Sequence, residues 1–168
     1  MVWDRGLDYE EAYSRILKHL YRSEPPASCY DAILLIQLRN GMRVSEAVRA
    51  FKEYLARRVL EVEVPVSKKR KPEARLAVVP RELLDAKLAG CRDLLALDGK
   101  KLAHRVKMYC LRRYGFNTHS LRYAFITYLL RQGVSPSIIA KITKHSRLDF
   151  ILTYTQEKAA EEILKKLG

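Results

Sequence analysis

The sequence lacks the long apolar runs that membrane-spanning proteins carry. No run approaches the ~20 residues that a transmembrane helix needs, and no secretory signal opens the chain. Cysteine is scarce too, with three widely spaced residues, Cys29, Cys91 and Cys110. Their odd number and spacing indicate neither a disulfide framework nor a zinc site. We therefore expect an intracellular, cytoplasmic protein whose cysteines are small buried apolar residues.

Acidic residues are few, because 19 Asp and Glu stand against 32 Lys and Arg, for a formal net charge of +13. Such an excess implies a polyanionic partner. The basic residues are spread along the whole chain, so nucleic acid fits better than a membrane surface. Asn and Gln are also scarce while charged residues reach 30%, a balance that favours a thermophilic source.

A glycine-rich phosphate-binding loop and a cluster of carboxylates that could hold a metal are both absent from the sequence. The sequence therefore indicates no cofactor and no metal ion. At 168 residues the chain is long enough for one domain with its own core. We see no internal repeat and no low-complexity tract that would divide it.

Apolar periodicity predicts a mainly α-helical domain with one small antiparallel β-sheet, an α+β fold. Alternating apolar residues from Val59 to Val79 predict a β-hairpin, whose turn is the basic segment 67–72. Asn40 and Gly41 are expected to end the second helix, because both accept a left-handed conformation. Helices are expected over about residues 9–22, 27–40, 44–57, 81–114 with a break near 97–99, 118–133, 135–142, 146–154 and 157–167.

Five short motifs carry basic, imidazole and phenol side chains. They are an arginine after the helix-ending glycine, a lysine-rich hairpin turn, a His-x-x-Arg helix, a second histidine and a Tyr-Thr pair. In chain order they centre on Arg43, Lys68, His119 with Arg122, His145, and Tyr154 about nine residues later. This order and spacing resembles the tyrosine recombinase (phage integrase) family over about residues 7–160. The resemblance and the composition together favour an integrase of an archaeal virus or plasmid.

The resemblance implies the fold of a tyrosine recombinase catalytic domain and the activity of a site-specific DNA recombinase. Such an enzyme cleaves and rejoins double-stranded DNA through a 3′-phosphotyrosyl intermediate without metal or ATP. It acts as a tetramer on DNA, and we expect a monomer or dimer in solution. Residues 1–168 would form a single catalytic domain without the family's N-terminal DNA-clasping domain, as either a fragment of a longer integrase or a minimal protein. The helix at 157–168 would either be exchanged between protomers or pack on its own domain through Ile163, Leu164 and Leu167.

The resemblance assigns two arginines to the phosphate. Arg43 and Arg122 would hold the non-bridging oxygens through their planar donor forks as negative charge builds up there. His119, one turn before Arg122, would add a donor or move a proton at the same phosphate. His145 would give a further hydrogen bond to a non-bridging oxygen. Glu46 is expected to buttress Arg43 or to favour the helix N-terminus.

The remaining assignments concern the attacking and departing oxygens. Tyr154 would be the nucleophile, and because the pKa of a tyrosine is near ~10 it needs a neighbouring base or a cationic field. A hairpin lysine would protonate the departing 5′ oxygen. Lys68 matches best, ahead of Lys69 and then Lys71, although the basic run could also be a solvated turn or a phosphate clamp.

Two positions depart from the common pattern, because Tyr123 stands where many relatives have His and Lys144 stands where Gly is common. Neither is required by the chemistry. A type IB topoisomerase, which uses a similar residue set, and a non-catalytic DNA-binding relative are the competing functions. Other basic residues could hold DNA as a surface, namely Lys100, Lys101, Arg105, Lys107, Arg112 and Arg113. The pattern does not indicate the target sequence or whether cleavage occurs in cis or in trans.

Overall fold

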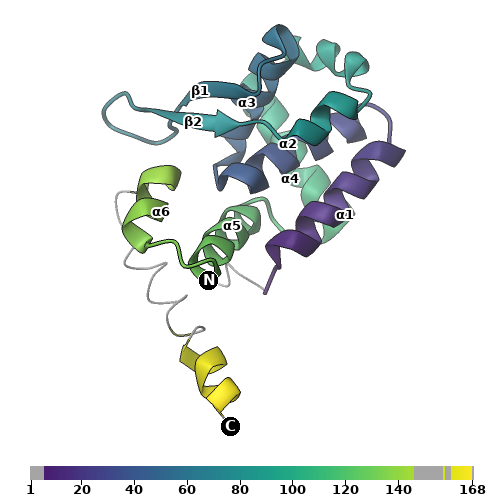
Figure 1. Cartoon of the computed structure of the whole chain (residues 1–168). Helices are drawn as coiled ribbons and strands as arrows, with labels where there is room; N and C mark the ends of the chain where they lie inside the picture. The colour runs from purple at the N-terminus through teal and green to yellow at the C-terminus, as the bar shows by residue number, and fades with distance from the viewer. Residues whose placement is uncertain (1–5, 146–156, 158–159, 168) are drawn as a thin grey trace.

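The structure, a computed structural model, describes residues 6–145, 157 and 160–167. Its elements are α1 (Tyr9–Arg22), α2 (Ala27–Asn40), α3 (Val44–Arg57), β1 (Glu61–Pro65), β2 (Ala74–Val78), the 3-10 helices η1 (Arg81–Asp85) and η2 (Ala89–Ala96), α4 (Gly99–Tyr114), α5 (His119–Arg131) and α6 (Pro136–Thr143). Residues 160–167 are also helical. The expected fold class, mainly helical with a small antiparallel sheet, is confirmed (Figure 1). Within the described residues no helix is long and apolar enough to cross a membrane.

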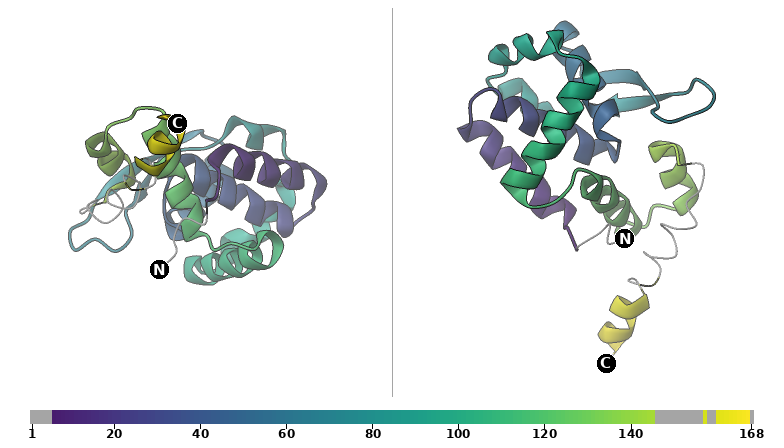
Figure 2. Two further views of the ribbon diagram at one scale, coloured as in Figure 1. Left: turned by 90° about the horizontal axis from the view of Figure 1, so that it is seen from below. Right: turned by 180° about the vertical axis from the view of Figure 1, so that it is seen from behind.

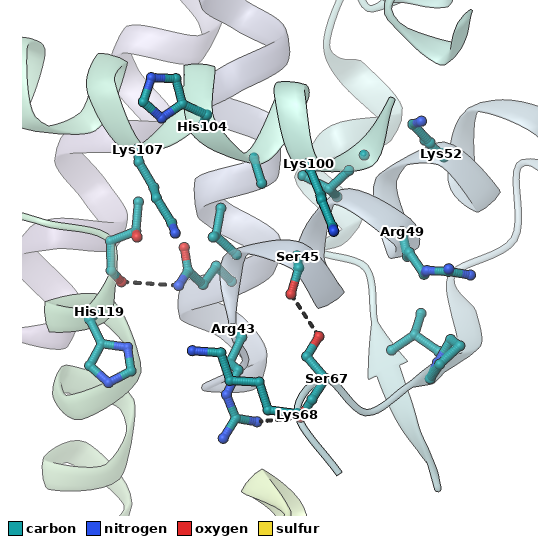
Figure 3. A pocket seen from close by; sticks show the side chains of 18 of the residues that line it. Arg43, Ser45, Arg49, Lys52, Ser67, Lys68, Lys100, His104, Lys107 and His119 are labelled. Atoms are coloured by element: carbon teal, nitrogen blue, oxygen red, sulfur yellow. Dashed lines mark hydrogen bonds between the residues drawn. The ribbon is translucent and has the colours of Figure 1, made fainter. Parts of the chain in front are cut away.

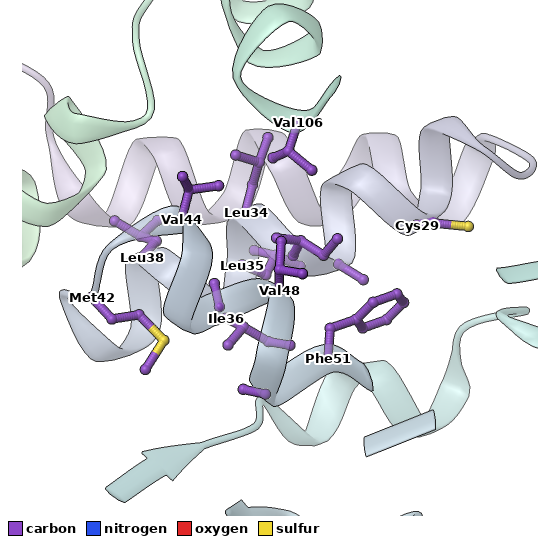
Figure 4. Packing of buried hydrophobic residues seen from close by; sticks show 14 of the residues in the cluster. Cys29, Leu34, Leu35, Ile36, Leu38, Met42, Val44, Val48, Phe51 and Val106 are labelled. Carbon is purple, nitrogen blue, oxygen red and sulfur yellow. The ribbon is translucent and has the colours of Figure 1, made fainter. Parts of the chain in front are cut away.

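The core is built around α2, which is buried on nearly every face. Its consecutive side chains Leu34, Leu35 and Ile36 are fully buried, and α1, α3, α4 and α5 all pack against it. Val48 and Phe51 of α3 join the same apolar cluster (Figure 4). A helix with apolar residues all round needs neighbours all round. The run of apolar residues in α2 therefore places this helix at the centre of the domain.

The β-hairpin is fastened to the end of α2. Strands β1 and β2 pair antiparallel, with Val62 opposite Ala77. The side chain of Asn40, the last residue of α2, binds the backbone of β2 as a third strand would. Its Nδ2 donates to the carbonyl of Val78 at 2.9 Å, and its Oδ1 accepts from the Val78 N–H at 2.8 Å. The turn between the strands extends beyond the body on the side of α6 (Figure 1).

The remaining helices surround this centre. Helix α4 lies across the side of the domain that is hidden in Figure 1, where it packs on α2 and α3 (Figure 2). Residues 160–167 lie beyond the end of α5, and Arg131 contacts Glu162 there with 2.9 Å between Nη2 and Oε1. The apolar stripe of this segment is exposed, at 60% for Ile163, 72% for Leu164 and 80% for Leu167. The stripe therefore does not pack on the described part of its own domain.

The expectation for the cysteines is wrong for two of the three. Cys29 and Cys91 form a disulfide between α2 and η2, across a sequence separation of 62 residues. Cys110 is free and buried, as expected. The sequence spacing could not indicate the bond, because only the folded chain brings the two cysteines together.

The stretch that begins at Arg81 also differs from the prediction. It was expected to be α-helical up to a break near residue 97, but it forms the short 3-10 helices η1 and η2. The reason is tertiary contact, which overrides local pattern. The disulfide holds η2 against α2, and Gly90 lies so close to Pro25 that a Cβ there would come within 2.9 Å of the proline Cγ.

Candidate active site

A pocket of about 1210 Å³ opens between α3, β1, α4 and the start of α5. Its basic side chains are Arg43, Arg49, Lys52, Lys68, Lys100, His104, Lys107 and His119, and its acidic ones are Glu53, Glu63 and Asp98. Figure 3 shows Arg43, Lys68 and His119 gathered at one end. Arg49 and Lys52 lie toward the other end. The pocket is thus an extended positive surface suited to a chain of anions.

Arg43 is held at the start of α3 by Glu46, whose side chain is fully buried. Glu46 Oε1 accepts from the Arg43 backbone N–H at 3.0 Å, and Glu46 Oε2 accepts from the Ser67 N–H at 2.9 Å. The Arg43 guanidinium donates to the Ser67 carbonyl at 3.3 Å. Ser45 and Ser67 also meet through their hydroxyls at 2.7 Å. Glu46 therefore buttresses Arg43, as expected, and it also fixes the hairpin turn beside that arginine.

Lys68 follows Ser67 in this anchored turn. Its backbone is left-handed, with φ at 61°, and its exposed side chain lines the pocket together with Arg43. Lys69 instead lies 3.9 Å from a carboxylate oxygen of Glu73. Neither Lys69 nor Lys71 lines the pocket. The geometry thus favours Lys68 among the three hairpin lysines.

His119 begins α5, and its Nε2 lies 3.1 Å from the hydroxyl of Tyr123 one turn later. The two rings meet edge to face with centroids 4.9 Å apart. Desolvation of the imidazole, followed by the charges of Arg122 and Arg43, lowers the pKa of His119 to about 4. At neutral pH the ring is therefore uncharged, and one of its nitrogens is able to accept a proton.

Arg122 is completely buried in α5. Its Nη2 donates to the carbonyl of Thr143 at 2.9 Å and lies 3.2 Å and 3.1 Å from Nδ1 and Nε2 of His145. Its Nε and Nη1 are also buried and have no hydrogen-bond partner among the described residues. Burial, followed by the charge of Arg43, lowers the pKa of Arg122 to about 10, so the group is still cationic at neutral pH. An oxyanion is the ligand that would satisfy such donors.

His145 is half-buried beside Arg122. Burial, followed by the charges of Arg122 and Arg43, lowers its pKa to about 3, so this ring is also neutral at physiological pH. Its Nδ1 lies 2.6 Å from the hydroxyl of Thr143. Lys144, between these two residues, has φ at 61°. A glycine would adopt this left-handed conformation more readily than a lysine does.

The structure brings five of the six predicted site residues into one cluster, in which the charges of neighbouring cations lower the pKa values of His119, Arg122 and His145. These residues are Arg43, Lys68, His119, Arg122 and His145. Arg122 and His145 lie beside the pocket and do not contribute to its lining. Tyr154, the predicted nucleophile, lies outside the described residues, as does the helix expected at 146–154.

Sequence reasoning missed one buried basic residue that supports this cluster. Arg75 of β2 is only 4% exposed, and its Nη2 donates to the carbonyl of Asn40 at 2.6 Å. Burial lowers its pKa, and the Glu46 carboxylate is the next largest influence. The signal that could have found Arg75 is its register opposite the buried Val64, which places it on the inner face of the hairpin.

Comparison with known proteins supplies the family. No family model and no solved structure matches the chain. A protein of Acidianus two-tailed virus named "Putative integrase" is 43% identical over 99% of this chain and 69% of its own length. An uncharacterized protein of Methanocaldococcus jannaschii is 32% identical over 99% of this chain and 89% of its own. A "Putative integrase" of Sputnik virophage is 29% identical over 98% of this chain and 89% of its own.

The fold and the site define a basic α+β domain with buried arginine donors suited to an oxyanion. The chain belongs to the integrase family that the Acidianus virus protein represents.

Proposed function

We propose that this integrase is a tyrosine recombinase, a site-specific enzyme that cleaves and rejoins double-stranded DNA through a 3′-phosphotyrosyl intermediate with Tyr154 as nucleophile. One observation carries the proposal. Arg43, the N-cap residue of α3, and Arg122 of α5 lie in a single cluster with His119 and His145 beside a positive pocket. This is the set of groups that stabilises extra charge on a phosphodiester under attack.

The chemistry follows from the charge state of these groups. The Tyr154 oxygen bonds to phosphorus while the bond from phosphorus to the 5′ oxygen breaks. Arg43 and Arg122 are cationic and take the charge that develops on the non-bridging oxygens. His119 is neutral and accepts the tyrosine proton, and Lys68 gives a proton to the departing 5′ oxygen. The reverse steps rejoin the strand, and the phosphodiester energy is conserved in the covalent bond, so neither ATP nor a metal ion is needed.

The remainder of the pocket would hold the DNA backbone on either side of the reacting phosphate. Helix α4 has 16 residues and is therefore about 24 Å long, enough to follow several phosphates. Lys100 and Lys107 of α4 line the pocket opposite Arg49 of α3. Removing one such cation should weaken binding to all DNA sequences alike and reduce the slope of log K against log salt by about 1.

We further propose a tetramer on DNA, in which the exposed apolar stripe of residues 160–167 docks on a neighbouring protomer. Support comes from the exposure of Ile163, Leu164 and Leu167, since a stripe of this kind needs a partner to leave water. Deleting residues 159–168 should therefore abolish oligomerisation on DNA, measured by light scattering. Unchanged assembly of the truncated chain would exclude this role for the stripe.

The central test is a covalent adduct. The protein is incubated with nicked DNA duplexes that trap the cleaved state, and denaturing gels reveal protein joined to a 3′ end. Tyr154→Phe should form no adduct. No adduct with the parent chain on a broad panel of DNA sequences would refute cleavage, and an adduct with Tyr154→Phe would refute the choice of nucleophile. Strand exchange between two duplexes then separates a recombinase from a type IB topoisomerase.

A matched pair of variants separates chemistry from binding. Arg43→Ala removes a cation at the N-cap of α3 and Arg49→Ala removes one within α3, at opposite ends of the pocket. Arg43→Ala should abolish cleavage and weaken DNA binding only modestly, whereas Arg49→Ala should weaken binding and leave cleavage of bound DNA intact. Equal losses of binding and cleavage in both variants would indicate that Arg43 serves DNA binding and not the chemical step.

A further inference from the structure

A single carboxylate connects the basic turn of the hairpin, residues 67–72, to the end of α6. It belongs to Glu73, the residue between this turn and β2, whose backbone carbonyl accepts from the Val66 N–H at 2.8 Å. The Glu73 carboxylate lies 3.9 Å from Nζ of Lys69 in the turn and 3.5 Å from Nζ of Lys144, the C-cap residue of α6. Two ion pairs of one side chain thus link two segments that are far apart in the sequence.

The basic turn needs such an anchor because its own side chains repel one another. Residues 68–71 are four consecutive cations, and like charges favour an extended loop. On the side of α3 the turn is held by Glu46, which accepts from the Ser67 N–H at 2.9 Å. On the side of α6, toward which the turn extends (Figure 1), the described residues make ion pairs with the hairpin only through Glu73.

The anchored turn lies close to the predicted reacting groups. Lys68 lines the pocket together with Arg43. Burial is the largest cause of the low pKa values of His119 and His145, and among the smaller causes is the charge of Lys68 at His119 and that of Lys69 at His145. A shift of the turn would therefore move Lys68 relative to the phosphate that these groups are expected to bind.

We propose that Glu73 is a positioning residue that ties the basic turn to the end of α6 and thereby holds Lys68 in place to protonate the departing 5′ oxygen. The inference rests on the proposed function only in this last step. One carboxylate between two ammonium groups forms a small network, and the side chains of Lys69 and Lys144 are only 22% and 30% exposed, so solvent screens them less than an isolated surface pair. Glu73 and its two partners do not line the pocket, so DNA bound there does not have to displace them.

Amide hydrogen exchange tests the anchor without any cleavage. The N–H groups of Val66 and Ser67 make the last hydrogen bonds before the turn, so their exchange reports its opening. Glu73→Gln and Lys144→Met should each accelerate this exchange about two- to fivefold, the equivalent of one or two partly exposed ion pairs. The matched control is Glu61→Gln, which removes an exposed carboxylate at the other end of the same hairpin and should leave the exchange unchanged.

The pattern of exchange decides whether the anchor exists. Parental exchange in both Glu73→Gln and Lys144→Met would overturn the inference. Acceleration by Glu73→Gln alone would mean that Glu73 compacts the turn through Lys69 without tying it to α6, which would overturn it as well. If the contact acts as a unit, the double variant should exchange no faster than Glu73→Gln.

Cleavage assays then test the consequence for Lys68. Single-turnover cleavage by Glu73→Gln should slow about two- to fivefold, with Glu61→Gln at the parental rate. A DNA substrate with sulfur in place of the 5′ bridging oxygen at the cleaved phosphate has a leaving group that departs as a thiolate and needs no proton. On that substrate Glu73→Gln should cleave as fast as the parent chain.

The sulfur substrate separates positioning of Lys68 from general support of the site. An equal defect of Glu73→Gln on both substrates would overturn the link to Lys68, because the loss would not depend on the proton of the leaving group. Absence of cleavage in every chain, including the parent, would refute the proposed function but leave the exchange result standing.

Discussion

Replacing Gly41 with alanine should destabilise the protein more than the same replacement at Gly115. Both glycines end helices in the left-handed region, with φ at 58° and 80°. An L-residue there costs about 1–2 kcal/mol. A Cβ on Gly115 meets nothing within 4 Å, whereas a Cβ on Gly41 falls on the buried ring of Phe125, within 2.7 Å of its Cγ and Cε1. Both replacements therefore carry the cost of a left-handed L-residue, but only the one at Gly41 adds a steric clash with Phe125.

The steric clash with Phe125 determines how much more stability Gly41→Ala should lose than Gly115→Ala. Overpacking a core costs about 1–3 kcal/mol, so Gly41→Ala should lower the free energy of unfolding by about 2–5 kcal/mol in total, against about 1–2 kcal/mol for Gly115→Ala. Urea unfolding followed by circular dichroism measures both values. Because Gly41 lies two residues before Arg43, we also expect slower DNA cleavage by the folded Gly41→Ala chain.

A second-site change checks the cause of the Gly41 effect. Phe125→Ala removes the three ring atoms that the new methyl group meets, so the combined loss in the double variant should be smaller than the sum of the two single losses. Equal losses of stability at Gly41 and Gly115, or strict additivity with Phe125→Ala, would refute the argument from the collision.

Three further predictions concern the rest of the fold. Reducing the Cys29–Cys91 bond, which spans 62 residues, should lower the unfolding free energy by up to about 4 kcal/mol in denaturant titrations with and without reductant. Lys144→Gly should raise the melting temperature or leave it unchanged, because glycine suits the left-handed turn, whereas the control Lys141→Gly inside α6 should cost about 1 kcal/mol. Stability should also fall as the pH drops from about 6.5 toward 3, by at most about 1.4 kcal/mol per unit from His145. The folded pKa of His145 lies at about 3, so in that range the unfolded chain binds the proton more readily; His145→Asn should flatten this part of the pH profile.

The helices and the hairpin could be predicted from the sequence because their signals are local. Helix α2 ends at Asn40 and α3 begins at Val44, as the glycine between them indicates. The hairpin strands lie within the alternating segment between Val59 and Val79. Contacts between distant residues were not predictable in this way, which is why the disulfide and the 3-10 helices η1 and η2 were missed.

On β2, the hydrophobicity of the residues does not predict which side chains are buried. Leu76 is 53% exposed while its neighbour Arg75 is 4% exposed, the reverse of what their chemistry suggests. The arginine is buried because two groups stabilise it there, the carbonyl of Asn40 and the nearby carboxylate of Glu46. Both belong to the region around Arg43. The buried arginine beside an exposed leucine therefore marks the site.

The same arginine completes the electrostatics of the proposed reaction. The charges of Arg43 and Glu46 both act on Arg75 and on Arg122, as the causes of the pKa shifts of these two buried arginines show. Both neighbouring histidines are neutral at physiological pH. Arg43, Arg75 and Arg122 with Glu46 therefore carry a net charge of +2, and Lys68 adds a further cation. A phosphodiester brings one negative charge, and attack by an oxygen nucleophile adds a second as the transition state forms. An excess of cations attracts the doubly charged transition state more strongly than it attracts the singly charged phosphodiester of the bound DNA, and such a difference accelerates a reaction where uniform binding does not.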